Sequence, residues 1–481
     1  MILSILFGLL CVFLALRYSY WRRHNIPFVP LKFPYIFGNV TKEKHQALQF
    51  TDFYKSHRSR AHDMNRPIIG VYMFLDPSVL IVDLELMRSI LTENFAHFQN
   101  RGMFYNDRDD PLSAILGTLN HEKWRPLRTK LTPAFTPSKI KDMFPIMKTV
   151  GDELVKGLNE IIAIDNQVEI RKLFSRFTTD VIGKVAIGIQ CNTLNRSTQL
   201  REMAKKAMEP YLKFPWNHLT IAHPDLARFL GIRKHSKEVS DFFVNVVEQT
   251  IQYRMENDER RNDYMQLLID SGLSTKEIAA LAFDLLSAGY ADSTSTLAYC
   301  LYELALPNNK HIQHKARKEI QSVLGEHNGQ LTYEVLNKMI YCRQIINETL
   351  RKHPVAGNAT RIATKPFRVP NTDFTIPTGM RVFIPIYAVH HDAAFFPDPE
   401  RFIPERFSEE PLPNAFLAFG AGPRKCIGFR FATLLVTVGL VSLLRNFEFS
   451  TSARTQIPIQ YSSTKNTLIP SDGVWLKVDR I

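Results

Sequence analysis

Cysteine is scarce in this sequence and is never clustered. Only five cysteines occur among 481 residues: Cys11, Cys191, Cys300, Cys342 and Cys426. Small secreted domains that depend on disulfides carry many cysteines, usually an even number. The odd, scattered set therefore argues against a disulfide framework and favours a reducing compartment.

Modules that bind nucleic acids or dinucleotides are also missing. The formal net charge is +13, yet the chain has no arginine-rich tract and no recognisable nucleic-acid-binding module. The positive charge therefore indicates attraction to anionic lipid or to an acidic protein, and no nucleic-acid partner is expected. The sequence also lacks a G-x-G-x-x-G fingerprint and a flavin module, so no dinucleotide-binding domain is expected.

Charge is absent from the first stretch of the chain. Ile2 to Leu16 is uncharged and almost wholly apolar, and Arg17 can reach towards the interface, which brings the span close to the ~20 residues that a bilayer requires. Aromatic residues typical of a membrane interface follow, and then a basic pair that marks the cytosolic side. These residues are Tyr18, Tyr20 and Trp21, then Arg22 and Arg23. Because the basic residues follow the apolar run and no small-residue cleavage site is evident, residues 1–21 are predicted to be an uncleaved transmembrane anchor and not a signal peptide.

Prolines then stiffen the chain. Pro27 and Pro30 lie three residues apart, with Pro34 just beyond, so this segment is not helical. Residues 22–35 are predicted to be a basic and proline-rich hinge that sets the angle of the anchor. The chain as a whole is 45% hydrophobic and 22% charged, which is typical of a globular protein with a substantial core.

Hydrophobic periodicity predicts mostly helices, with a few strands. Helical spacing runs over residues 140–158, 173–187, 236–255 and 275–304. In the last of these, Ser274 or Thr275 is the predicted N-cap, with Glu277 near the third position of the helix. A β-hairpin is predicted from Pro67 to Val82 with its turn at Asp76 and Pro77, and a strand is predicted over residues 381–386.

The most informative stretch is a glycine-rich loop that contains a lone cysteine. It runs from Phe419 to Gly428, and an apolar segment without proline or charge follows from Phe431 to Leu444, which predicts a buried helix. A sulfur at a helix N-terminus lies near free N–H groups and the positive end of the helix dipole, so the Cys426 thiolate is expected to be favoured over the thiol. Arg424 adds a cation, and the glycines allow close approach to a flat group. The pattern predicts a thiolate metal ligand beneath a large planar cofactor.

The spacing F-x-x-G-x-R-x-C-x-G resembles the haem-binding signature of the cytochromes P-450. It is filled here by Phe419, Gly422, Arg424, Cys426 and Gly428. A buried structural cysteine in a chance glycine loop is the alternative for an isolated cysteine, but five fixed positions within ten residues make chance a poor explanation. The resemblance implies haem b (iron protoporphyrin IX) with an axial thiolate from Cys426, and a cofactor contact from Phe419.

Other motifs resemble the same family and occur in its order. Trp124 and Arg128 lie four residues apart on one helical face, which alone indicates only an amphipathic helix. Beside the cysteine loop they resemble the family's W-x-x-x-R element. The resemblance implies that the two haem propionates are bound by Arg101, Trp124, Arg128, Arg361 and Arg424.

Small residues interrupt the longest predicted helix. Ala288 and Gly289 leave room for a flat ligand, although they also permit close helix packing. The family pattern A-G-x-(acid)-Thr is altered here, because Ala291 takes the position of the acid and Asp292 that of the threonine. Asp292 and Ser293 form an acid–alcohol pair displaced by one residue. Because one residue turns a helix by about 100°, the displaced pair reaches the usual places only with a local bulge.

Proton delivery depends on this altered segment, because oxygen activation requires ordered transfer of two protons. We expect Asp292 to supply protons itself, or Ser293 or Thr294 to take the role of the missing alcohol. Either arrangement predicts lower coupling of reductant consumption to product formation.

A further set of motifs has a structural role. Glu348 and Arg351 lie at i and i+3 on one helical face, a pair that on a surface contributes only ~0.2–1 kcal/mol. With Arg406 of the P-E-R-F segment they resemble the family's E-x-x-R and P-E-R-F triad, which would rigidify the segment that leads to the cysteine.

The resemblance of these motifs implies a mainly α cytochrome P-450 fold: the anchor, the hinge and one helical haem domain over residues 36–481 with a small β-sheet region. The chain resembles the insect xenobiotic-metabolising branch of the microsomal cytochromes P-450. The resemblance implies a monooxygenase of the endoplasmic reticulum membrane, with its catalytic domain on the cytosolic face. It would insert one oxygen atom from O2 into a lipophilic small molecule (xenobiotic, terpenoid, steroid or fatty acid). The implied partners are membrane lipid, an NADPH-dependent flavoprotein reductase and, as a second electron donor, cytochrome b5.

Two alternatives stay open because the usual acid–threonine pair is replaced by Ala291 and Asp292. One is a haem-thiolate isomerase or dehydratase, which needs no external electrons. The other is a haem-binding protein that is catalytically impaired.

Overall fold

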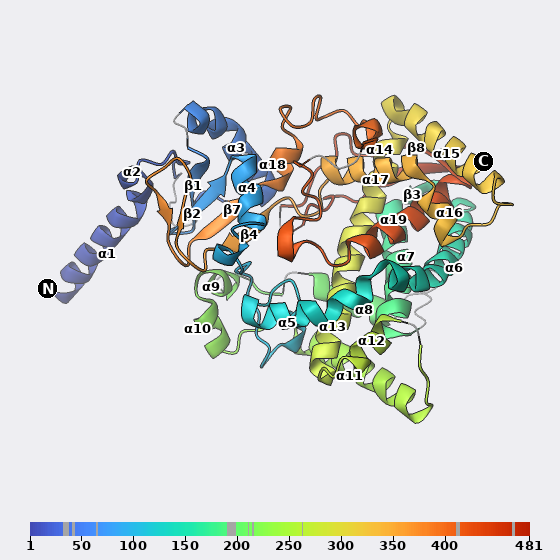
Figure 1. Ribbon diagram of the computed structural model, residues 1–481, viewed down its shortest axis with the longest axis horizontal. Helices are drawn as coiled ribbons and strands as arrows, with labels where there is room; N and C mark the ends of the chain where they lie inside the picture. Colours follow the sequence, from blue (N-terminus) through green and yellow to red (C-terminus); the bar gives the residue numbers. More distant parts are fainter. Residues whose placement is uncertain are drawn as a thin grey trace.

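Helices form most of the computed structural model, and the described strands form three small sheets, of which the two larger lie towards opposite ends of the molecule (Figure 1). The structure describes residues 1–31, 38–40, 44–63, 66–189, 199–209, 211–213, 216–261, 263–409, 414–463 and 467–481. The predicted mainly α fold with a small β region is confirmed.

The larger sheet has the strand order β1-β2-β7-β4. Its strands are β1 (Ile68–Met73), β2 (Asp76–Ile81), β7 (Arg381–Ile384) and β4 (Ala359–Ile362). The predicted hairpin is present, but its turn lies at Phe74 and Leu75, because Asp76 already pairs with Met73 in the ladder. Phe74 has a φ of 57°, the left-handed conformation that such a tight turn requires. The other strands are β3 (Gln167–Glu169), β5 (Phe367–Arg368), β6 (Thr375–Ile376), β8 (Phe447–Thr451) and β9 (Trp475–Arg480).

The helical part is built around α19 (Phe429–Leu444), whose side chains from Leu434 to Leu444 are all buried. Gly439 allows close packing there, since a Cβ at this position would lie 3.1 Å from the side chain of Leu297 and 3.2 Å from that of Phe177. The helices that pack around this core include α6 (Pro137–Ile162), α7 (Ile170–Ile182), α14 (Thr294–Ala305) and α17 (Ile340–Lys352).

The remaining helices surround this core or lie beside the larger sheet. They are α3 (Gln46–Asp63), α4 (Leu84–Leu91), α5 (His121–Leu131), α8 (Gln199–Met208), α9 (Trp216–Ala222), α10 (Pro224–Phe229), α11 (Lys237–Glu256), α12 (Tyr264–Asp270), α15 (Lys310–Gly325), α16 (Tyr333–Asn337) and α18 (Ile386–His390).

The longest predicted helix is interrupted by a π-helical turn. It consists of α13 (Thr275–Ala288), the π turn η6 (Gly289–Ser293) and α14. Ser274 is the N-cap, and its reciprocal bonds with Glu277 complete the expected capping box. The π turn is the local bulge that the displaced Asp292–Ser293 pair was expected to need.

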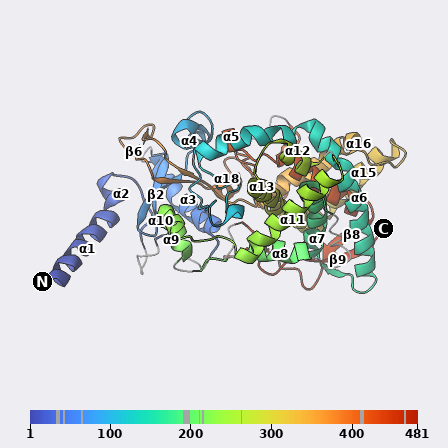
Figure 2. The same ribbon diagram turned by 90° about the horizontal axis from the view of Figure 1, so that it is seen from below.

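The N-terminal helix α1 (Ile2–Tyr18) projects away from the body in both views (Figures 1 and 2). None of its residues is buried. Among the described residues, no helix is both long and apolar enough to cross a membrane. Residues 32–35 of the predicted hinge lie outside the described residues.

Trp21 corrects the predicted aromatic belt. It lies in the short helix α2 (Tyr20–Arg23) and is 0% exposed. Its indole N–H donates to the Val71 carbonyl of β1 at 3.2 Å, and its ring occupies the space where a side chain of Gly70 would be. Trp21 is therefore a core residue of the sheet region and not a membrane-interface residue, because the sheet offers its ring an apolar site and its N–H a carbonyl partner.

Candidate functional site

The cysteine loop is held in place by backbone contacts. The Cys426 N–H donates to the Phe419 carbonyl at 2.9 Å, just before α19 begins. Gly422 has a φ of 66°, and a Cβ there would lie 1.8 Å from the carbonyl oxygen of Leu91 in α4. Only glycine fits this position, so the loop is closely packed against α4. Phe419 packs against Phe429, with 6.0 Å between ring centroids.

The Cys426 thiol is accessible to solvent although it lies deep inside the protein. Burial raises its pKa, while the Gly428 N–H and the positive charges of Arg101 and Arg128 act in the opposite direction without offsetting the burial. The expected preference for the thiolate is therefore not met in the protein alone. Here desolvation of the charged sulfur outweighs the helix terminus and the nearby cations, and a bound metal cation would supply the missing compensation.

Arg424 joins the cysteine loop to the segment before α5. Its guanidinium donates to the carbonyls of Gln99, Leu116 and Leu119 at 3.2, 3.4 and 2.9 Å. It also lies over the ring of Trp124, 4.0 Å from the centroid. Most of the donors of Arg424 are thus used within the protein, and Trp124 stacks on the cation that braces the loop.

Positive charge accumulates around the thiol without a matching anion. Within the described part of the chain, none of Arg101, Arg128, Arg361 and Arg424 forms an ion pair, and the buried Nε of Arg361 has no hydrogen-bond partner. Burial lowers the pKa of Arg361 to about 9, with a further contribution from Arg101. Burial also lowers the pKa of Arg424 to about 9, with contributions from Arg101, Arg361 and Arg128. A planar group with two carboxylates, such as haem, fits this arrangement because it supplies the missing anions.

The helix around the π turn provides another wall of the same space. Ala288 and Asp292 are exposed although they lie in the middle of a helix whose other faces are packed. Although the Asp292 side chain is exposed, the surrounding protein raises its pKa to about 7 by burial, with a further contribution from Asp284. The carboxylate therefore faces an enclosed space and not the open surface. Cys426 is exposed as well, and Asp292 acts on it by raising its pKa, which indicates that the two side chains lie near each other. We call the space beside them the central cavity.

The other residues of this segment point elsewhere. A Cβ on Gly289 would lie 2.3 Å from the Cδ1 of Ile182 in α7, so Gly289 serves helix packing. Ser293 and Thr294 are 3% and 1% exposed, and the Thr294 hydroxyl bonds to that of Thr178 at 2.8 Å. The π turn therefore directs only Asp292 of the three candidate proton donors towards the central cavity. The Thr294 hydroxyl is directed to α7 instead.

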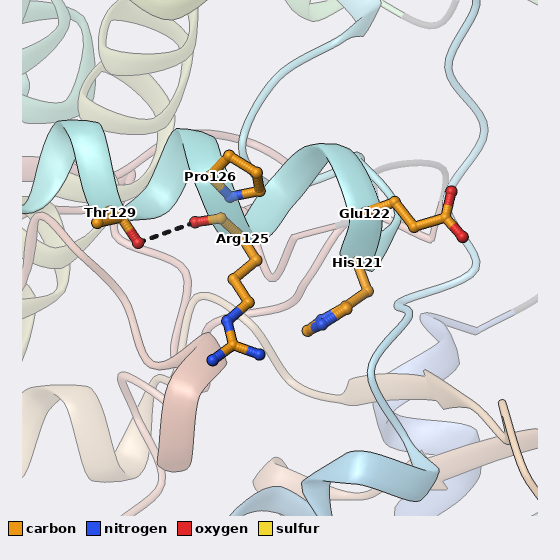
Figure 3. A pocket seen from close by; sticks show the side chains of 5 residues that line it. All are labelled: His121, Glu122, Arg125, Pro126 and Thr129. Atoms are coloured by element: carbon orange, nitrogen blue, oxygen red, sulfur yellow. Dashed lines mark hydrogen bonds between the residues drawn. The ribbon is translucent and has the colours of Figure 1, made fainter.

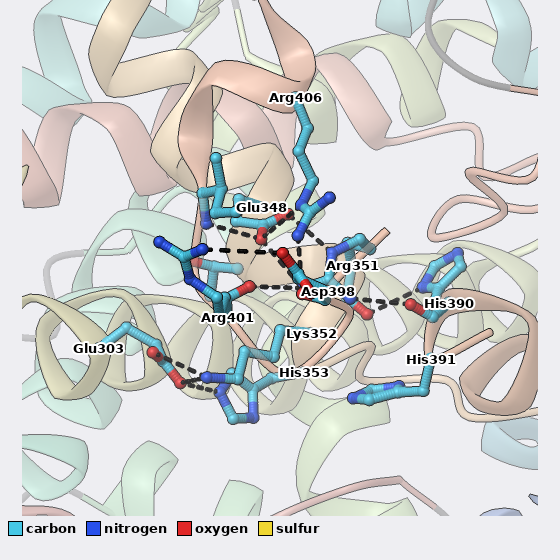
Figure 4. Close-up of polar contacts among 12 residues, drawn as sticks. Glu303, Glu348, Arg351, Lys352, His353, His390, His391, Asp398, Arg401 and Arg406 are labelled. Carbon is cyan, nitrogen blue, oxygen red and sulfur yellow. Dashed lines mark hydrogen bonds and ion pairs between the residues drawn. The ribbon is translucent and has the colours of Figure 1, made fainter. Parts of the chain in front are cut away.

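The expected triad is assembled next to the cysteine side (Figure 4). The Glu348 carboxylate accepts two hydrogen bonds from Arg351, at 2.7 and 2.9 Å, and lies 3.4 Å from the Nε of Arg406. It also accepts the Ile403 N–H at 2.9 Å. Arg351 in turn donates to the His390 carbonyl at 2.8 Å. These bonds join α17 to the segment that leads to the cysteine loop.

Two residues near the central cavity were not found from the sequence. Asp284 lies two helical turns before Asp292, and its Oδ2 accepts the Leu116 N–H at 3.1 Å. Lys234 precedes α11, and its charge influences Asp284. The spacing of Asp284, Ala288 and Asp292 at every fourth position is a signal for the first residue. No sequence signal marks Lys234, because its position depends on how α11 packs against α13.

The outer face of α5 is a shallow surface pocket. It is lined by His121, Glu122, Arg125, Pro126 and Thr129 (Figure 3). Arg125 and Glu122 are exposed there. Helix α5 thus presents Trp124 to the cysteine loop and Arg125 to the surface.

The site consists of a cysteine in a braced loop, unpaired arginines around it and a helix face of small residues beside it. These features define a haem-thiolate protein. The chain belongs to the cytochrome P450 family, whose sequence profile matches residues 30–478. It is 38% identical to Probable cytochrome P450 6a20 of Drosophila melanogaster, over 97% of this chain and 96% of that protein. It is 39% identical to Probable cytochrome P450 6a23 of the same species (100% and 98%) and 35% identical to Cytochrome P450 6A1 of Musca domestica (100% and 97%).

The resemblance to the insect branch of this family is therefore confirmed. The protein is a cytochrome P450 monooxygenase, and its cofactor is haem with a cysteine thiolate as axial ligand. The isomerase, dehydratase and impaired-protein alternatives are not favoured by these relatives.

Proposed function

We propose that Cys426 is the haem ligand and that the central cavity takes lipophilic small molecules. The observation that carries this proposal is the convergence of Cys426, the unpaired arginines and Asp292 on one enclosed space. When bound there, haem supplies the chemistry that inserts one oxygen atom from O2 into a substrate. The chain contributes the thiolate, the positive charges for the propionates at Arg101, Arg128 and Arg361, and walls that limit access of water.

Substrate-binding difference spectra provide the test of this function. The haem-loaded protein is screened with lipids, terpenoids, steroids and xenobiotics, and compounds that bind are then incubated with NADPH and a flavoprotein reductase. We expect oxygenated product only when the reductase is present. Conversion without reductant would contradict a monooxygenase and favour rearrangement chemistry.

We propose that Asp292 holds a proton at the oxygen side of the site. Because burial raises the pKa of Asp292 to about 7, its carboxyl carries the proton below that pH and loses it above. Coupling of NADPH consumption to product is therefore expected to fall as the pH rises through 7, because the protonated fraction falls from about one half at the pKa to about one tenth one unit above it. Asp292→Thr should abolish this pH dependence and reduce peroxide release.

The measurement is hydrogen peroxide released per NADPH consumed between pH 6 and 8.5. Thr294→Ala is the matched control, because that hydroxyl bonds to Thr178 and does not face the cavity. It should keep the pH profile of the unmodified enzyme. Tight coupling at pH 8 in the unmodified enzyme, or an unchanged profile in Asp292→Thr, would contradict the role of Asp292.

We infer that α1 attaches the protein to the endoplasmic reticulum membrane, with the body on the cytosolic side. None of its apolar side chains is buried, and Phe7, for example, is 68% exposed. Burial of such side chains in lipid is favourable by roughly 25 cal/mol per Å². Arg22 and Arg23 directly follow and suit an anionic, cytosolic membrane face.

Two truncations test the attachment and locate its end. Deletion of residues 1–17 should move the protein from the microsomal to the soluble fraction while haem content is retained. Deletion of residues 1–23 removes Trp21 as well, which should lower stability by about 3–5 kcal/mol and reduce haem content. A protein that stays in the microsomal fraction after the shorter deletion would show that another surface holds the membrane.

We propose that the electron donor docks on the cysteine side of the molecule. Exposed basic residues occur there on the cysteine loop and on α5, namely Lys425, Arg430, Arg125 and Lys130. The two elements are adjacent, because a Cβ on Gly428 would lie 3.6 Å from the ring of Phe135, just after α5. A basic surface close to the haem thiolate suits an acidic partner such as an NADPH-dependent flavoprotein reductase or cytochrome b5.

A further inference from the structure

The wall of the central cavity formed by α13 and the π turn carries two acids. Asp284 and Asp292 lie on the same side of the helix, with the small Ala288 between them. The segment before α11 lies next to this wall, since the His235 ring contacts that of Phe283 with 5.1 Å between centroids. Few other charged groups of the described chain influence these two acids. The two acids differ in the hydrogen bonds and positive charges that compensate their negative charge.

The negative charge of Asp284 is partly compensated by a hydrogen bond and by nearby positive charges. Its Oδ2 accepts the Leu116 N–H at 3.1 Å, and the positive charges of Arg101 and Lys234 act on it. Lys234 also acts on Asp110, whose carboxylate accepts the Lys234 and His235 N–H groups at 2.8 and 2.9 Å. The charge of Lys234 is thus shared between two carboxylates.

The negative charge of Asp292 has no such compensation. Within the described residues its carboxylate has no hydrogen bond and no ion pair, and the charge of another acid, Asp284, adds to the effect of burial on its pKa. The arginines beside Cys426 are directed to the two haem propionates in the proposed function. The remaining charge that a ligand meets beside the haem is therefore negative.

We propose that Asp292 binds the positive charge of a lipophilic amine, so that protonated amines are a preferred substrate class of this enzyme. A carboxylate without a partner in an enclosed cavity is unfavourable, and a ligand cation placed against it removes that cost, whereas an anionic ligand would add to it. Asp284 strengthens the negative potential from two turns away. This inference rests on the proposed function, because it needs Cys426 and Asp292 to border one haem-containing cavity.

Two ligands of equal shape separate charge from hydrophobicity. The 4-phenylbutyltrimethylammonium ion carries a permanent positive charge and has no lone pair with which to bind iron, and 5,5-dimethylhexylbenzene is its neutral isostere. Both are measured by equilibrium dialysis against the haem-loaded full chain in phosphatidylcholine nanodiscs at pH 8, with empty nanodiscs subtracted. We expect the cation to bind at least about tenfold more tightly than the isostere.

Variants then assign the preference to one residue. Asp292→Asn should lower affinity for the cation at least about tenfold and change affinity for the isostere less than about twofold, while Asp284→Asn should cause a smaller loss for the cation alone. Glu277→Gln is the matched control, because it removes an acid from the same helix outside the cavity and keeps the capping box. It should change neither affinity.

Equal affinities in the unmodified protein, or an unchanged preference in Asp292→Asn, would overturn the inference. Haem content and the reduced carbon-monoxide spectrum are recorded on the same samples. If these are intact and the cation preference is absent, the amine inference alone fails. If the unmodified protein does not bind haem through a thiolate, the proposed site fails and this inference with it.

Discussion

Replacing Cys426 by serine is expected to abolish the haem-thiolate spectrum and to reduce reductase-supported turnover to background. A serine hydroxyl is a much poorer donor to iron than a thiolate, and it cannot push electron density towards O–O cleavage. Neither Cys300 nor Cys342 can substitute, because both are fully buried in the helical core. The measurements are haem content, the reduced carbon-monoxide difference spectrum and product formed per NADPH consumed.

The fold should survive this change. The loop is held through the Cys426 backbone N–H and through Arg424, neither of which depends on the sulfur. Thermal unfolding of the haem-free Cys426→Ser variant should therefore match that of the haem-free unmodified protein within a few degrees. Cys300→Ala is the control, and it should retain the thiolate spectrum. A thiolate spectrum that persists in Cys426→Ser would show that the ligand lies elsewhere.

Replacing Glu348 by alanine is expected to have the largest effect on stability. Glu348 and Arg351 are each 0% exposed, and the change leaves the Arg351 guanidinium and the Ile403 N–H without their acceptor. Loss of one partner of a buried ion pair costs about 3–5 kcal/mol. That is a large part of the ~5–15 kcal/mol by which proteins are stable, so we expect little folded, haem-loaded protein.

An exposed pair with the same spacing provides the control for this prediction. Lys139 and Asp142 lie at i and i+3, 3.9 Å apart, and both are partly exposed to solvent. Asp142→Asn should change the free energy of unfolding by less than about 1 kcal/mol. Both variants are compared by urea unfolding and by haem content after expression. If Glu348→Ala proved as stable as Asp142→Asn, the triad would not be needed to hold the cysteine side.

The structure explains why this triad contributes far more than its spacing suggests. From the sequence, Glu348 and Arg351 are an ordinary helical pair. In the fold they lose all contact with water, and Arg406 and the Ile403 N–H converge on the same carboxylate from a segment far along the chain. Burial removes the solvent screening that makes surface pairs weak, so each remaining bond matters more.

The cysteine loop and the central helix show how much local sequence determines. Gly422 specifies the tight turn at the loop because its φ of 66° lies in the left-handed region that favours glycine. The uncharged segment up to Leu444 specifies a buried helix, and Ser274 with Glu277 specifies where the central helix begins. These features follow from periodicity, capping and backbone geometry within a few residues, and all of them are predictable.

Tertiary structure alone decided which side chains reach the central cavity. Asp292, Ser293 and Thr294 were equal candidates as neighbours in the sequence, and the π turn together with packing against α7 directs only Asp292 to the cavity. The sheet region buries Trp21, which its position after an apolar run assigned to a membrane interface. Likewise, the ionisation of Cys426 depends on how deeply the surrounding protein encloses it.

The chain by itself determined the helices, the haem ligand motif and the family, because these are recorded in local sequence patterns. Orientation, burial and charge compensation were decided by the fold, because they depend on contacts between segments that lie far apart in the chain.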